Sequence, residues 1–111
     1  MIVYVASPFH GEGSAEAQRE NMKRAAVYCA WVAQRGHVPY APHLMFPLFL
    51  DENKPGERDI ALKCGIEMLK RCDQLIAFTD HGISEGMKAE IEFARSIGKP
   101  VQFATLEGGA K

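Results

Sequence analysis

Short apolar runs alternate with helix-like segments along this chain, and the alternation limits the possible folds more than any other feature. Residues 2–6 form a β-branched and aromatic run that Ser7 and Pro8 bring to an end. Three later runs have the same character and occupy residues 37–43, 73–78 and 101–104. Strands that alternate with helices predict right-handed crossovers and a parallel sheet covered by helices on both faces.

Helices are expected in the segments between these strands. The first follows Ser14, a suitable N-cap, and runs to residue 35, where Gly36 can adopt the left-handed conformation that closes a helix. The second covers residues 57–71, and the third follows Ser84 and stops near residue 97. These boundaries give each strand a helical connection to the next one.

Length and composition predict one domain. The chain has 111 residues, of which 47% are hydrophobic, and this is enough to bury a single core. We therefore expect an α/β protein: a flavodoxin-like three-layer fold over residues 1–111, with a parallel sheet of four to five strands. Trp31 and Val27 should pack on that sheet, and Cys29, Cys64 and Cys72 are expected to be buried free thiols.

The charge balance favours a small-molecule partner. A formal net charge of −1 provides no long-range attraction for a nucleic acid polymer or an anionic membrane. The chain has no apolar run of about 18 residues, and its start lacks a basic n-region, so we expect a cytoplasmic protein. His, Cys and Asp residues show no metal-ligand spacing, and therefore neither a metal nor a cofactor is expected.

A ligand crevice is predicted at the carboxyl ends of the strands, where open α/β sheets bind their ligands. Residues 7–13, 41–44 and 79–84 meet there with the start of the last helix. Two roles are open for His43, a structural histidine in the loop and a ligand contact. The first loop offers main-chain amides and hydroxyls to an anion, but Glu16 stands where a dinucleotide fingerprint needs its third glycine. The candidate ligand contacts are Ser7, His10, Gly11, His43, Asp80, Ser84, Gly86 and Met87.

Glu90 is the carboxylate that the helical pattern directs inward. On a helical wheel it falls on the apolar stripe with Met87, Ile91 and Ala94, whereas Glu92 falls on the solvated side. A hydrogen-bonded structural glutamate would explain the wheel alone. Its place in the second turn of a helix that opens onto the predicted crevice favours a nucleophilic carboxylate.

Several of these residues together resemble a known family. Tyr4, Asp73 and the Gly86-x-x-x-Glu90 spacing look like the nucleoside 2-deoxyribosyltransferases and the related deoxynucleoside monophosphate N-glycosidases. The segments LKRCD at residues 69–73 and ISEGMKAEI at residues 83–91 resemble small bacterial and phage domains allied to that superfamily. The resemblance covers most of the chain and implies a nucleoside or nucleotide ligand.

The resemblance also implies roles for individual residues. Glu90 matches the nucleophile that attacks C1′ of a 2′-deoxyribosyl group, and Tyr4 matches the tyrosine that orients it. Ser84 matches the serine that binds a 5′-phosphate in the glycosidases, where the transferases usually have an acidic residue. The family aspartate that lies eight residues before the strand aspartate is Gly65 here. Asp80, His81 and His43 are candidates to replace that aspartate.

Three functions remain open at this point. The first is an N-glycosidase or deoxyribosyltransferase acting on a 2′-deoxynucleoside or its 5′-monophosphate. The second is a catalytically silent module that binds a nucleotide or a ribosylated signal molecule in the same crevice, which Gly65 favours. The third is an interaction domain that uses the apolar segment LMFPLFL at residues 44–50, although it leaves Glu90 unexplained. That segment predicts a homodimer or a higher homo-oligomer.

Overall fold

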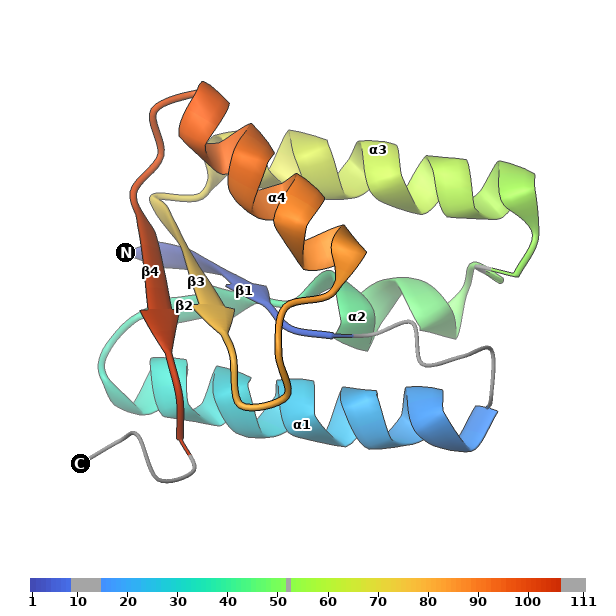
Figure 1. Ribbon diagram of the computed structural model, residues 1–111, viewed down its shortest axis with the longest axis horizontal. Coiled ribbons are helices and arrows are strands. Elements are labelled where there is room, and N and C mark those ends of the chain that lie inside the picture. Colours follow the sequence, from blue (N-terminus) through green and yellow to red (C-terminus); the bar gives the residue numbers. More distant parts are fainter. Residues whose placement is uncertain (9–14, 52, 107–111) are drawn as a thin grey trace.

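The computed structural model describes residues 1–8, 15–51 and 53–106 and arranges them in three layers (Figure 1). Within these residues the central sheet has four parallel strands in the order β2-β1-β3-β4. The strands are β1 (Ile2–Ala6), β2 (Val38–Tyr40), β3 (Gln74–Phe78) and β4 (Val101–Ala104). The helices are α1 (Ala15–Gln34), α2 (Pro42–Met45), the 3-10 helix η1 (Phe46–Leu48), α3 (Pro55–Arg71) and α4 (Glu85–Ser96). The expected three-layer α/β fold is confirmed.

Each face of the sheet has its own hydrophobic core, because successive strand residues point to opposite sides. One face packs against α1, which lies below the sheet in Figure 1; the other packs against α3 and α4. The α1 face buries Val3, Val5, Ile76 and Phe78 with Tyr28 and Val32. The opposite face buries Tyr4, Ala6, Leu75 and Ala77 with Leu69, Met87, Ile91 and Ala94.

Strand β1 is central, and the order of the strands reverses at it, because β2 lies on one side and β3 and β4 lie on the other. It pairs with β2 on one side and with β3 on the other. Tyr4 is the Cα partner of both Tyr40 and Leu75. In open parallel sheets, such a switch point leaves a crevice at the carboxyl ends of the strands. This geometry directs attention to the residues that follow β1 and β2 and to the start of α4.

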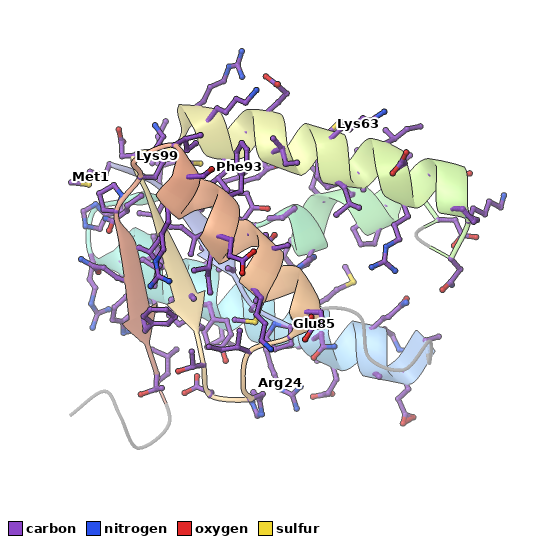
Figure 2. The ribbon with its side chains drawn as sticks, turned by 45° about the horizontal axis from the view of Figure 1, so that its top comes forward. Met1, Arg24, Lys63, Glu85, Phe93 and Lys99 are labelled. Carbon is purple, nitrogen blue, oxygen red and sulfur yellow. The ribbon has the colours of Figure 1, made fainter. Side chains whose placement is uncertain are left out.

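Helix α4 begins at the residue that the sequence predicts. Ser84 has an extended backbone, and its Oγ accepts a hydrogen bond of 3.2 Å from the backbone N–H of Met87. This contact satisfies one of the helix's unpaired N–H groups. Figure 2 shows Glu85 at the start of α4, with Phe93 farther along the helix and Lys99 beyond its end. Gly98, with φ of 75°, then turns the chain toward β4.

Several local expectations are wrong. The second strand, expected over residues 37–43, covers only Val38–Tyr40, residues 42–48 form α2 and η1, and α3 begins at Pro55 instead of residue 57. Val27 is 57% exposed because the buried stripe of α1 follows Asn21, Ala25, Tyr28 and Val32, which leaves Val27 on a neighbouring face. Cys64 is exposed and Cys29 is only half-buried, so the expected burial is found for Cys72 alone; all three thiols are free.

In the part of the chain that the structure describes, no helix has the length and apolar character needed to cross a bilayer.

Candidate functional site

Tyr4 and Glu90 meet between the sheet and α4. The Tyr4 hydroxyl donates a hydrogen bond of 2.6 Å to Oε2 of Glu90, across 86 positions of sequence. Tyr4 is 2% exposed and Glu90 is half-buried. The inward direction of Glu90 is therefore confirmed, and its chemical role stays a prediction.

Burial controls the protonation of Tyr4. It raises the pKa of Tyr4 well above its usual value, and the negative charge and the hydrogen bond of Glu90 raise it further. Burial disfavours the charged phenolate, and a neighbouring carboxylate disfavours it again. Tyr4 therefore remains a hydrogen-bond donor at neutral pH and holds one oxygen of Glu90 in a defined position.

Gly65 lets α3 approach the Tyr4 hydroxyl closely. It is buried, and a Cβ atom built on it would lie 3.3 Å from the Tyr4 oxygen. This contact is tighter than the usual van der Waals distance, so a side chain at position 65 would press on the atom that orients Glu90. Gly65 is thus a direct neighbour of the Tyr4–Glu90 pair.

Two hydroxyl groups near the carboxyl ends of β1 and β2 have buried oxygens. Ser7 follows β1 and is 1% exposed, and Tyr40 is the last residue of β2. Neither hydroxyl has a hydrogen-bond partner among residues 1–8, 15–51 and 53–106. Buried polar atoms in folded proteins are nearly always hydrogen-bonded, so these two hydroxyls keep a hydrogen-bonding capacity that the described residues leave unused.

The predicted contacts at the start of α4 have separate positions. Ser84 is half-buried at the N-cap, and Gly86 is exposed in the first turn. The Met87 side chain is 1% exposed and belongs to the core that includes Tyr4. Met87 contributes to the cap through its backbone, which bonds to Ser84 Oγ. Ser84 and Gly86 are thus the members of this group that lie toward solvent.

The other predicted contacts that the structure describes lie on different elements. Asp80 accepts hydrogen bonds from the Tyr28 hydroxyl at 2.9 Å and from the Leu106 N–H at 2.9 and 3.2 Å, so it joins the end of β3 to α1 on the opposite face. His43 is half-buried on α2, and His81 is exposed. His10 and Gly11 lie outside the described residues. Among those that are described, no three His, Cys, Asp or Glu residues are grouped so that they could hold a metal ion.

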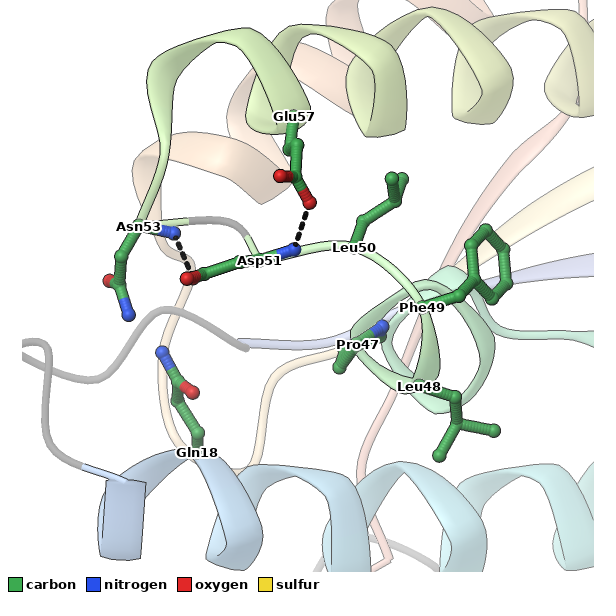
Figure 3. A pocket seen from close by; sticks show the side chains of 8 residues that line it. All are labelled: Gln18, Pro47, Leu48, Phe49, Leu50, Asp51, Asn53 and Glu57. Atoms are coloured by element: carbon green, nitrogen blue, oxygen red, sulfur yellow. Dashed lines mark hydrogen bonds between the residues drawn. The ribbon is translucent and has the colours of Figure 1, made fainter.

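A separate open pocket of about 400 Å³ lies between the N-terminal parts of α1 and α3 (Figure 3). Glu57 Oε1 accepts a hydrogen bond of 2.8 Å from the Asp51 N–H, and Asp51 Oδ1 accepts one of 2.9 Å from the Asn53 N–H. Both carboxylates therefore help to hold the loop. The lining residues are Gln18, Pro47, Leu48, Phe49, Leu50, Asp51, Asn53 and Glu57, and they include neither Tyr4 nor Glu90. Since both carboxylates of this pocket are engaged in holding the loop, we regard the Tyr4–Glu90 pair as the better candidate for the chemistry.

Tyr40 is the site residue that sequence reasoning missed. Its ring centroid lies 5.6 Å from that of Tyr4, with an angle of 51° between the planes. A signal for it exists in the sequence, because Tyr40 lies within the second predicted strand, close to the carboxyl-end loop where ligands bind. Only the pairing of β1 with β2 shows that the two tyrosines are neighbours.

Comparisons with known proteins agree with this fold. A family model described as "Domain of unknown function (DUF7768)" matches residues 1–104. A 2-deoxyribosyltransferase from the psychrotolerant bacterium Bacillus psychrosaccharolyticus is similar in structure, with a TM-score of 0.75 and 22% identity, over 97% of this chain and 74% of that chain. The Clostridium botulinum CMP N-glycosidase BcmB has a TM-score of 0.61 and 20% identity, over 95% of this chain and 71% of that chain. A search of curated proteins finds no match. The two structures show a shared fold.

Proposed function

The chain belongs to the DUF7768 family of domains of unknown function, and from this premise we propose that it cleaves the N-glycosidic bond of a 2′-deoxynucleoside or its 5′-monophosphate. Glu90 is the nucleophile, and Tyr4 is the residue that orients it. The observation that carries the proposal is the hydrogen bond of 2.6 Å from the buried Tyr4 hydroxyl to Glu90. The shared fold with a 2-deoxyribosyltransferase and a CMP N-glycosidase supports the substrate class.

The chemistry follows from a carboxylate that is held in one place. Glu90 attacks C1′, the bond from C1′ to the base nitrogen breaks, and the base leaves with the electron pair. The product is a glycosyl ester on Glu90, which water hydrolyses or a second base displaces. A fixed donor such as Tyr4 keeps the carboxylate aligned with the anomeric carbon, and this alignment lowers the entropic cost of attack.

The test is incubation of the purified protein with deoxynucleosides and their monophosphates, followed by chromatography of the bases. Release of a free base supports cleavage, and exchange with an added second base identifies a transferase. The second candidate function is a silent nucleotide-binding module, which the glycine at position 65 favours. A rise in melting temperature with a nucleotide, without base release, would identify that module.

We expect deoxynucleotides to bind more tightly than the matching deoxynucleosides. Ser84 Oγ accepts the Met87 N–H, and its own hydrogen can be donated to a phosphate at the N-terminus of α4. A favourable interaction of about 1 kcal/mol corresponds to a roughly fivefold preference for the nucleotide. Calorimetric titration with a nucleoside and its monophosphate measures this ratio.

Ser84→Asp is the matched variant for this expectation. Aspartate is as good an N-cap as serine, so α4 should keep its stability, but its charge repels a phosphate. The variant should lose the preference for the nucleotide and still bind the nucleoside. Equal affinities of the wild-type protein for both ligands would leave Ser84 as a helix cap only.

We also expect a homodimer or a higher homo-oligomer. Leu48 is 76% exposed, Phe49 is 62% exposed and Met45 is 40% exposed, whereas Phe46 is buried and is not available for contact. Apolar side chains this large are usually covered by a partner when they lie together on a surface. Light scattering at micromolar concentration tests the mass, and Leu48→Lys should lower it. A wild-type monomer under these conditions would contradict the expectation.

A further inference from the structure

Tyr40 lies beside the Tyr4–Glu90 pair, and the mechanism described above leaves it without a role. Tyr4 and Tyr40 are Cα partners in the parallel pairing of β1 with β2, so their side chains leave the sheet on the same face. Their ring centroids are 5.6 Å apart, and Tyr40 packs against the core cluster to which Tyr4 and Met87 belong. Tyr40 is therefore part of the same site.

The hydroxyl of Tyr40 is the feature that needs an explanation. Its oxygen is buried, yet it has no hydrogen-bond partner in the part of the chain that the structure describes. Ser7, next to the carboxyl end of the neighbouring strand, has a buried hydroxyl in the same condition. Such groups are rare in folded proteins and are typical of places where a bound polar molecule completes the hydrogen bonding.

The surroundings of Tyr40 keep this hydroxyl protonated. Burial raises the pKa of Tyr40 to about 12, and the neighbouring Cys64, Cys72 and Glu90 contribute to the rise. A phenol in this state donates a hydrogen bond at neutral pH and does not release its proton. Two of the alternative donors are less suitable, because Asp80 is engaged by Tyr28 and Leu106 on the other face and His81 is exposed.

We propose that the Tyr40 hydroxyl donates a hydrogen bond to the base as it leaves C1′, an inference that rests on the proposed function. When Glu90 attacks, the electron pair of the glycosidic bond moves onto the base, and the hydrogen bond stabilises this developing negative charge. Tyr40 keeps its proton. In the second half of the reaction, water attacks C1′ and the bond from C1′ to the Glu90 oxygen breaks. The carboxylate is restored, and the proton that the water loses neutralises the departed base.

Leaving groups of different acidity test this role. In 7-methyl-2′-deoxyguanosine the base carries a positive charge and leaves as a neutral molecule, so it needs no hydrogen-bond donor. The base of 2′-deoxyguanosine leaves with a negative charge and does need one. We expect Tyr40→Phe to lower kcat on 2′-deoxyguanosine by about 100-fold and to leave kcat on the 7-methyl compound within about twofold. For pyrimidines, 2′-deoxyuridine should lose more than its 5-fluoro derivative, whose base is the better leaving group.

Two control variants separate this role from others. Glu90→Gln and Tyr4→Phe act on the attacking carboxylate, so each should lower release from both members of a pair by similar factors. Tyr40→Phe removes a buried hydroxyl that no described residue satisfies, so its unfolding midpoint should not fall. The proposal would be overturned if Tyr40→Phe lowered kcat by equal factors on both members of a pair. It would also be overturned if the variant had a lower unfolding midpoint but unchanged kinetics. Either result would indicate that the hydroxyl holds a structural water.

The failure of the proposed function has a different signature. If the wild-type protein releases no base from any of the four compounds or from their 5′-monophosphates, cleavage is wrong, and calorimetry with the same compounds then decides the role of Tyr40. A roughly tenfold weaker affinity of Tyr40→Phe would support Tyr40 as a donor to the bound base. Equal affinities of the two proteins, or no binding, would overturn that role as well.

Discussion

Glu90→Gln is expected to lower base release by about 10³-fold or more while the protein still folds and binds its ligand. The amide keeps the size of the side chain, and its carbonyl oxygen can still accept the hydrogen bond that Tyr4 donates at 2.6 Å. It removes the negative charge that traps C1′, and a nucleophile that is removed costs a hydrolase several orders of magnitude in rate. Chromatographic base release measures the loss, and calorimetry measures the retained binding.

Glu92→Gln is the matched control for this prediction. Glu92 is an exposed carboxylate on the same helix, and we expect its replacement to change the rate by less than about twofold. Tyr4→Phe should give an intermediate loss of about 10- to 100-fold, because the carboxylate can still attack but is less well aligned. If Glu90→Gln releases base as fast as the wild-type protein, the assignment of the nucleophile is wrong.

Gly65→Asp is expected to have the second-largest effect, a loss of about 3 kcal/mol in the free energy of unfolding. A Cβ atom at this buried position already lies 3.3 Å from the Tyr4 oxygen, and the carboxylate beyond it would enter the surroundings of Glu90. Two carboxylates of like charge close to one buried phenol repel each other, and burial disfavours the added charge. Urea denaturation, compared with the wild-type protein, gives the change.

Gly65→Ala separates the volume of the side chain from its charge. Alanine adds the Cβ atom alone, and its better helix propensity, worth about 1 kcal/mol, opposes the tight contact with Tyr4. We expect its stability to stay within about 1 kcal/mol of wild type. If Gly65→Asp instead folds normally and accelerates base release, position 65 is the site of a general acid, and the leaving-group role of Tyr40 is wrong.

Local features of the fold could be predicted because they depend on residues that are close in sequence. The Ser84 cap contacts the backbone of Met87, three positions away, and Gly98 turns the chain at the end of the same helix. The direction of Glu90 follows from the periodicity of α4, and β4 has the bounds that its apolar run predicts. The second strand is shorter than its apolar run, because residues 42–48 form two short helices and Phe46 makes an edge contact with Phe49 there.

The sequence by itself determined the order of strands and helices, the α/β class and the inward carboxylate, since patterns of period two and 3.6 are properties of a single segment. Only the tertiary structure decided which segments meet. The pairing of β1 with β2 brings Tyr40 next to Tyr4, and the packing of α3 and α4 on one face brings Gly65 and Glu90 to the same hydroxyl. The same packing leaves Asp80 with α1 on the opposite face. These contacts depend on strand order and on close packing between distant segments, and no periodicity within one segment encodes either of them.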